Sequence, residues 1–171
     1  ADAKFLAGYN AMVLDYAARE PFWRRNLNYN HGTGHGVGYL GNIHEAPIGF
    51  RWKATRDAMC EIEPGMVITD EPGIYIEGSH GIRIENELLV RAGEKNEYGQ
   101  FLYFEPLTFV PIDLDALRPE LMTEEEKQLL NAYHQSVYEK ISPYLEAEEK
   151  EWLKEYTRPV KSVSYTHLTL P

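Results

Sequence analysis

The sequence has one cysteine, fewer basic than acidic residues, and no long apolar run. The single cysteine, Cys60, excludes an intrachain disulfide and favours a reducing compartment, so we expect a cytoplasmic protein. No stretch approaches the ~18 apolar residues that a membrane-spanning helix needs. A formal net charge of −10 repels phosphate backbones and anionic lipid headgroups. We therefore expect neither a nucleic-acid nor a membrane partner.

The length of 171 residues suits one ordinary domain or part of a larger one. Hydrophobic residues make up 43% and charged residues 26%, which excludes collagen-like, low-complexity and wholly disordered classes. The chain begins at Ala1 inside a stretch with a helical pattern, and we expect it to be a piece of a longer protein.

The order of apolar patterns predicts an α+β fold with a helix, a β-rich centre and further helices. Apolar residues recur at helical spacing in residues 2–20, and Pro21 follows as a helix stop. This stripe consists of Phe5, Leu6, Tyr9, Val13, Tyr16 and Ala17. Short apolar runs predict strands at 66–69, 74–76, 82–90 and 101–110, with a hairpin turn at 78–81. Thr123 and Glu126 form a capping box that predicts the start of a helix. We expect a second short helix over residues 146–156.

Three histidines fall in a glycine-rich, uncharged stretch. His31 and His35 have the spacing of zinc-binding helices, but the glycines between them disfavour a helix. In a strand, side chains four residues apart point to the same face, so two imidazoles would project together. One could bind a metal while the other contacts substrate, and His44 lies further along the same segment. An isolated histidine is more often a structural, hydrogen-bonded residue.

Two carboxylates follow in apolar surroundings. Glu71 comes just after the apolar run 66–69, and Glu85 lies beside Ile84. A buried carboxylate is costly unless it is paired or bound to a cation. One imidazole with two carboxylates suits Mn²⁺, Co²⁺ or Zn²⁺, and a bridging carboxylate lets such a set hold two metals. The alternatives are an acidic turn residue for Glu71 and the polar face of an alternating strand for Glu85.

Two other features do not support a site. Residues 36–41 fit the GxGxxG pattern, but a dinucleotide site needs a helix to begin there, and residues 42–47 predict none. Cys60 has no neighbouring base, so it is more typical of inert packing than of a nucleophile.

A set of longer motifs is more specific. They are HGTGHGVG from His31, NIHEAP from Asn42, DEPGIY from Asp70, GIRIEN from Gly81, FEPLTFVPI from Phe104, LLNAYH from Leu129 and WLKEYTRP from Trp152. In this order they closely resemble the C-terminal half of the metallopeptidase family that contains Xaa-Pro aminopeptidase. The resemblance covers nearly everything from Phe5 to Val160.

The resemblance implies the C-terminal half of a pita-bread α+β fold with C-terminal helices. Residues 1–112 would be part of the catalytic domain and 113–160 a helical extension. The last segment, 161–171, is rich in Ser, Thr and Leu, and we expect a disordered or non-native tail. The family also implies two divalent metal ions, commonly Mn²⁺ with Zn²⁺ or Co²⁺ as alternatives. Its substrates are peptides with proline in second position, and we expect a homodimer in the full-length protein.

Site residues follow from the resemblance motif by motif. His35 would be a metal ligand, Glu71 a second ligand that also passes a proton to the leaving amine, and Glu85 a bridge between the metals. His31 and His44 would hold substrate and stabilise the tetrahedral intermediate.

Tyr75 and Arg83 would support these groups from behind. The chemistry agrees with the residue types, because an Xaa-Pro bond is a tertiary amide whose nitrogen carries no hydrogen. Hydrolysis must therefore polarise the carbonyl and protonate the leaving proline nitrogen.

This sequence departs from the family in one respect. The family's metal site also uses two aspartates on a strand before the histidine motif. Only Asp2 and Asp15 precede His31 here, and Asp15 falls within the predicted first helix. We therefore expect the chain alone to bind metal weakly and to be nearly inactive.

Two other functions compete with the aminopeptidase. Prolidase cleaves Xaa-Pro dipeptides with a similar centre, although the segment 104–159 favours the aminopeptidase. Outside the enzymes, a non-catalytic pita-bread module would bind peptides or proteins. The presence of His35, Glu71 and Glu85 together argues against such a module.

Overall fold

The computed structural model describes residues 1–161. The helices are α1 (Ala11–Trp23), α2 (Glu124–Ile141) and α3 (Ala147–Tyr156). The strands are β1 (Lys4–Leu6), β2 (Gly34–Val37), β3 (His44–Phe50), β4 (Val67–Asp70), β5 (Gly73–Ile76), β6 (His80–Arg83), β7 (Asn86–Asn96) and β8 (Gly99–Pro106). Two compact units result: the first unit, Ala1–Thr108, and the second unit, which starts at Phe109.

No helix among residues 1–161 combines the length and the apolar character that a transmembrane span requires.

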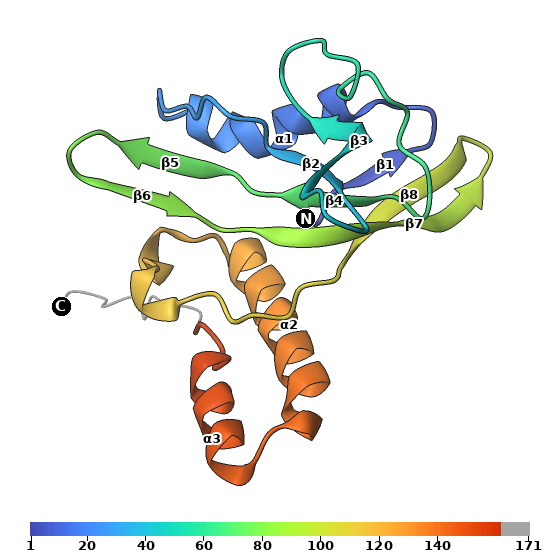
Figure 1. The fold of residues 1–171 in the computed structure, drawn as a ribbon. Coiled ribbons are helices and arrows are strands. Elements are labelled where there is room, and N and C mark those ends of the chain that lie inside the picture. Colours follow the sequence, from blue (N-terminus) through green and yellow to red (C-terminus); the bar gives the residue numbers. More distant parts are fainter. Residues whose placement is uncertain (162–171) are drawn as a thin grey trace, which may run out of the picture. The chain divides into compact units, whose positions relative to one another are not determined.

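Six strands of the first unit form one antiparallel sheet in the order β1-β8-β7-β4-β2-β3. The long hairpin of β7 and β8 lies within it, and α1 packs against β3 (Figure 1). The strands β5 and β6 pair only with each other, around the predicted turn. Because β2 pairs with both β3 and β4, the glycine-rich motif lies beside the end of β4, where Glu71 follows.

The glycines of β2 allow this close approach. A Cβ at Gly34 would lie 1.8 Å from the carbonyl oxygen of Thr69, and a Cβ at Gly36 would lie 2.1 Å from that of Glu45. Both distances are shorter than any side chain tolerates, so only glycine lets the neighbouring backbones pack here.

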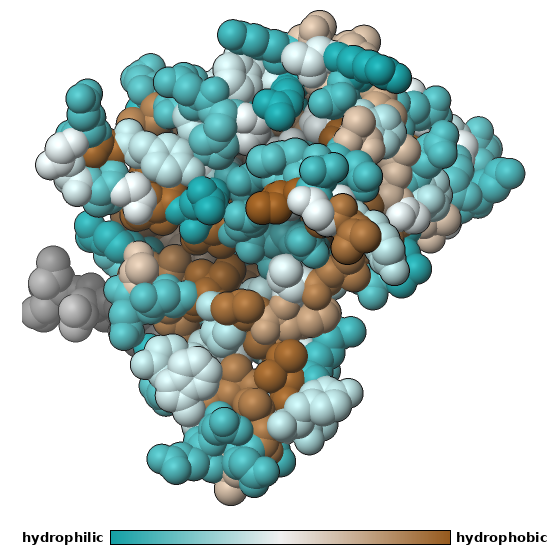
Figure 2. Space-filling model, viewed as in Figure 1, coloured by the Kyte–Doolittle hydropathy of each residue, from teal (hydrophilic) through white to brown (hydrophobic). Residues whose placement is uncertain are grey.

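The apolar core of the first unit is built by residues from most strands of the six-stranded sheet, together with α1 and the segment before β4. Leu88 and Val90 alternate along β7, as a strand with one buried face requires. They pack with Phe5, Ala11, Ile48, Phe50, Ile62, Ile68 and Leu102. The face seen in Figure 2 is largely hydrophilic, with apolar side chains reaching the surface in places.

The first helix starts and ends later than predicted. Phe5 and Leu6 lie in β1, which pairs with β8, and the helix begins only at Ala11. Asn10 caps it by accepting a hydrogen bond from the backbone N–H of Val13. Pro21 lies inside the helix rather than after it. A proline near the last turn removes one helical hydrogen bond without preventing the next ones from forming.

The buried face of α1 was also predicted wrongly. Tyr9, Val13 and Tyr16 of the predicted stripe are exposed, Tyr16 by 57%, whereas Asp15 and Arg19 are buried. Hydrophobic periodicity assigns charged residues to the solvent side. That assignment fails here because the two charges neutralise each other inside the fold.

In the second unit the predicted capping box is present, with reciprocal hydrogen bonds between Thr123 and Glu126 at the start of α2. Leu130 and Val137 of the predicted stripe are buried, whereas Tyr144 is exposed. The fully buried His134 also lies on α2, and its Nε2 accepts a hydrogen bond from the backbone N–H of Ile112. Residues 162–171 of the predicted tail lie outside the described part of the chain.

Candidate metal centre

A cavity of about 450 Å³ in the first unit brings most of the predicted site residues together. Its wall comes from β2, β3, the segment before β2, and the segment from Glu71 through the β5–β6 hairpin. The lining residues are His31, Gly32, Gly34, His35, His44, Arg51, Glu71, Tyr75 and Arg83. Glu85 does not line the cavity.

At the centre of this wall, His35 and Glu71 are in contact. The Nε2 atom of His35 lies 3.2 Å from Oε1 of Glu71, and the two side chains are 13% and 17% exposed. The His35 Nδ1–H donates to the carbonyl oxygen of Gly36 at 2.9 Å, so Nε2 is the ring nitrogen that faces Glu71. This orientation is typical of a metal-ligating imidazole.

A buried hydroxyl fixes both members of this pair. Thr69 Oγ1 donates to Oε1 of Glu71 at 3.1 Å and accepts from the backbone N–H of His35 at 3.0 Å. One threonine therefore sets the position of the carboxylate and of the strand that carries the imidazole.

His31 lies at the cavity wall on irregular backbone. It lies in the segment before β2 rather than on the strand, because β2 begins only at Gly34. Its Nδ1–H donates to the carbonyl oxygen of Gly32 at 2.7 Å, and its ring lies 5.4 Å from that of Tyr75. Its Nε2 is buried and has no hydrogen-bond partner among the described residues. An unpartnered buried nitrogen at a cavity wall is available to a substrate group.

The third histidine, His44, begins β3 on the exposed side of the cavity. Its ring centroid lies 4.2 Å from that of His35. The antiparallel pairing of β2 with β3 produces this contact between residues nine positions apart in the sequence.

Arg83, at the end of the β5–β6 hairpin, lies between two carboxylates. Its Nε lies 3.1 Å from Oε2 of Glu85 and 4.0 Å from Oε2 of Glu71. A hydrogen bond with Tyr75, together with the charge of Glu85, raises the pKa of Arg83. The hairpin thus presents a cation held by the predicted bridging carboxylate and by a phenol.

The donor set tests whether these residues fit the divalent metal ions that the resemblance implies. His35 and Glu71 converge with one nitrogen and one oxygen, a combination that Mn²⁺, Co²⁺ and Zn²⁺ accept. Within residues 1–161, no group of three or more His, Cys, Asp or Glu side chains is placed to hold a metal ion. Asp2 is exposed, and Asp15 is paired with Arg19. The described residues therefore fit part of a metal site.

Two residues of the site were not predicted. Thr69 could have been found from the sequence, because Glu71 follows it by two positions and residues two apart in a strand share a face. Arg51 lines the cavity after β3, and no sequence pattern marks it, because its place depends on the pairing of Gly34 with Phe50.

Comparison with known proteins identifies the family. The sequence profile of metallopeptidase family M24 matches residues 2–92, and that of the C-terminal region of peptidase M24 matches residues 100–160. The chain belongs to metallopeptidase family M24. Both profiles together cover the segments in which the motifs were recognised.

Two named relatives show which members of the family this chain resembles. The chain is 44% identical over 93% of its length to a probable Xaa-Pro aminopeptidase P of Talaromyces marneffei, and 43% identical over 92% to aminopeptidase P2 of Arabidopsis thaliana. It covers 25% and 22% of these proteins, so it spans about a quarter of the curated relatives' length.

A solved structure confirms the predicted α+β, pita-bread fold. X-prolyl aminopeptidase from Caenorhabditis elegans, described as a cytosolic enzyme with a di-nuclear active site, superposes with a TM-score of 0.85 at 37% identity. The match covers 94% of this chain and 26% of that one.

Proposed function

We propose that the complete protein to which this chain belongs hydrolyses the N-terminal Xaa-Pro bond of peptides. The observation that carries the proposal is the contact between His35 and Glu71 at the wall of a cavity that His31 and His44 also line. The names of the relatives and the M24 profile support the same reaction.

The proposal includes two divalent metal ions, for which Mn²⁺ is our choice ahead of Zn²⁺ and Co²⁺. His35 and Glu71 would hold them together with Glu85, and two aspartates on a strand N-terminal to the histidine motif would complete the set. When bound, such ions polarise the scissile carbonyl and lower the pKa of water. The di-nuclear site of the C. elegans enzyme supports the number of ions.

Glu71 has the position of a proton carrier. Its Oε1 faces both His35 and the hydroxyl of Thr69, which keeps the carboxylate fixed. The nitrogen of an Xaa-Pro bond carries no hydrogen, so it leaves as an amine only if a proton reaches it. We assign to Glu71 the transfer of this proton from the attacking water, whose oxygen bonds to the carbonyl carbon, to the leaving nitrogen.

The outer histidines would bind substrate. The buried Nε2 of His31 is open to a polar group of the peptide, and His44 lies beside His35 at the exposed edge. Together they would hold the scissile carbonyl and stabilise the charge that develops on its oxygen. Tyr75 and Arg83 would keep the hairpin wall in place.

The same proposal places the complete enzyme in the cytosol, as its C. elegans neighbour is, and expects it to form a homodimer.

The test is peptide cleavage by the complete protein with and without added Mn²⁺. We expect release of the first residue from Xaa-Pro-Xaa tripeptides, loss of activity with a chelator, and restoration by Mn²⁺. Glu71→Gln keeps the side-chain shape and should reduce kcat by at least about 100-fold.

The alternatives give different results in the same assay. Cleavage restricted to Xaa-Pro dipeptides would mean that the complete protein is a prolidase and not an aminopeptidase. Tight peptide binding without any cleavage, unchanged by metal, would indicate a non-catalytic module and overturn the proposal.

A further inference from the structure

A buried ion pair on α1 lies next to the segment that carries His31. Arg19 Nε donates to Oδ2 of Asp15 at 2.6 Å, and the two side chains are 0% and 1% exposed. Charges taken out of water need hydrogen-bond partners for all their donors and acceptors. The remaining partners of this pair therefore show which part of the chain it holds.

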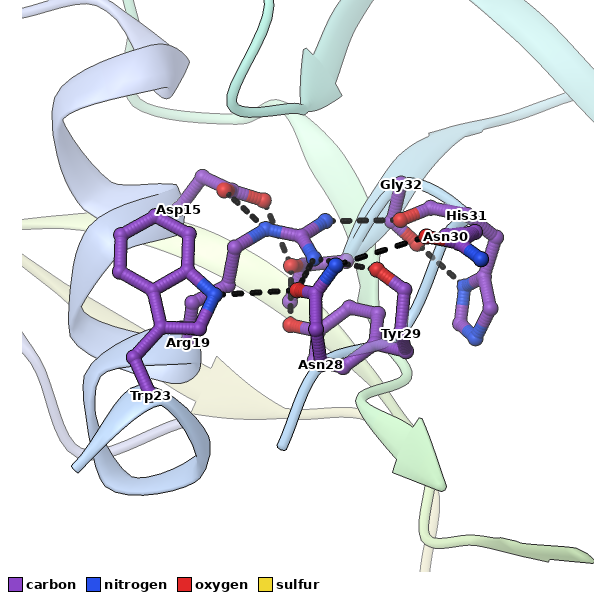
Figure 3. A network of polar contacts seen from close by, with 9 residues as sticks. Asp15, Arg19, Trp23, Asn28, Tyr29, Asn30, His31 and Gly32 are labelled. Carbon is purple, nitrogen blue, oxygen red and sulfur yellow. Dashed lines mark hydrogen bonds and ion pairs between the residues drawn. The ribbon is translucent and has the colours of Figure 1, made fainter. Parts of the chain in front are cut away.

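Arg19 uses its terminal nitrogens on the backbone around His31. They donate to the carbonyl oxygens of Tyr29 and His31, each at 2.7 Å (Figure 3). The guanidinium also stacks on two rings, with its Cζ 4.0 Å from the centroid of Tyr29 and 3.9 Å from that of Trp52. A planar guanidinium is suited to hold two carbonyls and two ring faces at once, whereas an ammonium is not.

Asp15 holds the other end of the same segment. Its Oδ1 accepts from the hydroxyl of Thr33 at 2.6 Å, and that hydroxyl accepts from the phenol of Tyr29 at 2.6 Å. Burial raises the pKa of Tyr29, so the phenol keeps the proton that it donates. Residues 29–33, referred to below as the His31 segment, are thus fixed at both ends by one ion pair.

The His31 segment also reaches Glu71. The backbone N–H of Glu71 donates to the carbonyl oxygen of Thr33 at 2.7 Å. The N–H of Thr33 in turn donates to the carbonyl oxygen of Phe50 at 2.8 Å. A shift of this segment would therefore move His31 directly and the backbone of Glu71 through one hydrogen bond.

We infer that Arg19 and Asp15 are positioning residues for the hydrolysis: they hold His31, and through Thr33 the backbone of Glu71, at the cavity wall. The inference rests on the proposed function. Both side chains are buried and neither lines the cavity, so we assign them no contact with the substrate. Because an error of about 1 Å in a reacting group can reduce a rate roughly 100-fold, the effect should appear in kcat.

A double-mutant cycle in the complete, metal-loaded protein tests the inference. We expect Arg19→Lys to lower kcat by about 10- to 100-fold while KM changes by less than about threefold. In a His31→Asn background the same change should lower kcat by a clearly smaller factor, because the part of the loss that acts through His31 is already absent and only the part that acts through Glu71 remains. Each measurement is made well below the unfolding temperature of the variant.

A purely structural role gives another outcome. Leu102→Ala, a core variant on β8 away from the cavity, provides a destabilised control whose kcat should stay at the wild-type level. Equal kcat losses from Arg19→Lys in both backgrounds, or a loss matched by Leu102→Ala at equal thermal stability, would overturn the inference. If Arg19→Lys does not fold, Thr33→Val takes its place in the cycle, since it removes only the hydroxyl that joins Asp15 to Tyr29.

Hydrogen exchange provides a readout that does not depend on activity. We expect Arg19→Lys to raise exchange at the amides of Thr33 and Glu71 while the β7–β8 hairpin stays protected. Unchanged protection at both amides would count against the positioning role whatever the kinetics show. An inactive wild-type protein with this exchange pattern intact would reject the proposed function alone.

Discussion

Each unit contains a buried polar side chain that attaches an irregular segment to a helix, and the two attachments differ in chemistry. In the first unit, Arg19 holds the carbonyls of Tyr29 and His31, and its charge is balanced by Asp15. In the second unit, a neutral imidazole, His134, holds the backbone N–H of Ile112.

The difference lies in how completely the groups are paired. The Nε and both terminal nitrogens of Arg19 donate hydrogen bonds, whereas Nδ1 of His134 is buried without a partner among residues 1–161. Burial lowers the pKa of His134, while an arginine stays charged at any pH that proteins encounter. The segment that carries a candidate catalytic residue is therefore held by a guanidinium, whose own charge does not change with pH.

The largest expected effect comes from breaking the stronger attachment. Asp15→Ala leaves the charge of Arg19 buried without a partner, and this should cost about 3–5 kcal/mol of stability in the first unit. Hydrogen exchange, followed segment by segment, should show the loss in α1 and residues 29–33. A loss below about 1 kcal/mol would mean that water reaches the pair and that the attachment is weak.

A smaller loss of stability is expected when the attachment in the second unit is broken. His134→Leu removes the acceptor and leaves the N–H of Ile112 unsatisfied, which should cost about 1–3 kcal/mol. His134→Asn, which retains an acceptor, should recover part of it. Exchange at the Ile112 amide reports this directly, and equal protection in both variants would contradict the assigned hydrogen bond.

A fall in pH should weaken the attachment made by His134. The folded pKa of His134 lies below its ordinary value, so the unfolded chain binds the proton more readily. Its contribution to stability is complete above about pH 6.5 and is lost as pH falls below that value, by at most about 1.4 kcal/mol per pH unit.

The measurement is the pH dependence of exchange protection in α2, with His134→Asn as the control that should remove this component. An unchanged pH profile in the control would assign the effect to other groups.

The smallest effect is expected for an exposed ion pair. Arg91 on β7 and Glu105 on β8 pair at the surface, where solvent screens the charges, so Arg91→Gln should change the free energy of unfolding less than any of the variants above. High salt should reduce even this difference in a denaturant titration. A cost close to that of Asp15→Ala would show that burial does not explain the strength of the first attachment.

Periodicity and turn residues predicted much of the fold, because these signals are local. The hairpin turn, the capping box at Thr123 and the short helix after residue 146 all depend on neighbours within a few positions. The first helix failed because its buried face depends on tertiary structure. A buried charged pair at i, i+4 is indistinguishable in sequence from an exposed one, because its partners, the carbonyls around His31 and the hydroxyl of Thr33, are supplied by the tertiary fold.

In the candidate site, too, some residues were predicted from the sequence and others were missed. His31, His35, His44 and Glu71 were identified from motifs, and the cavity joins them. Thr69 was missed although its spacing of two from Glu71 was a usable signal, and Arg51 was missed because its place depends on the pairing of strands that are distant in the sequence.

The packing of β2 has a consequence for how this family evolves. Glycine is required at positions 34 and 36 because neighbouring carbonyls occupy the space of a side chain, and this requirement is independent of catalysis. A descendant that lost its histidines would still need both glycines in order to fold. In a comparison of lineages, the glycines of HGTGHGVG would mark shared architecture, and only the histidines would mark retained chemistry.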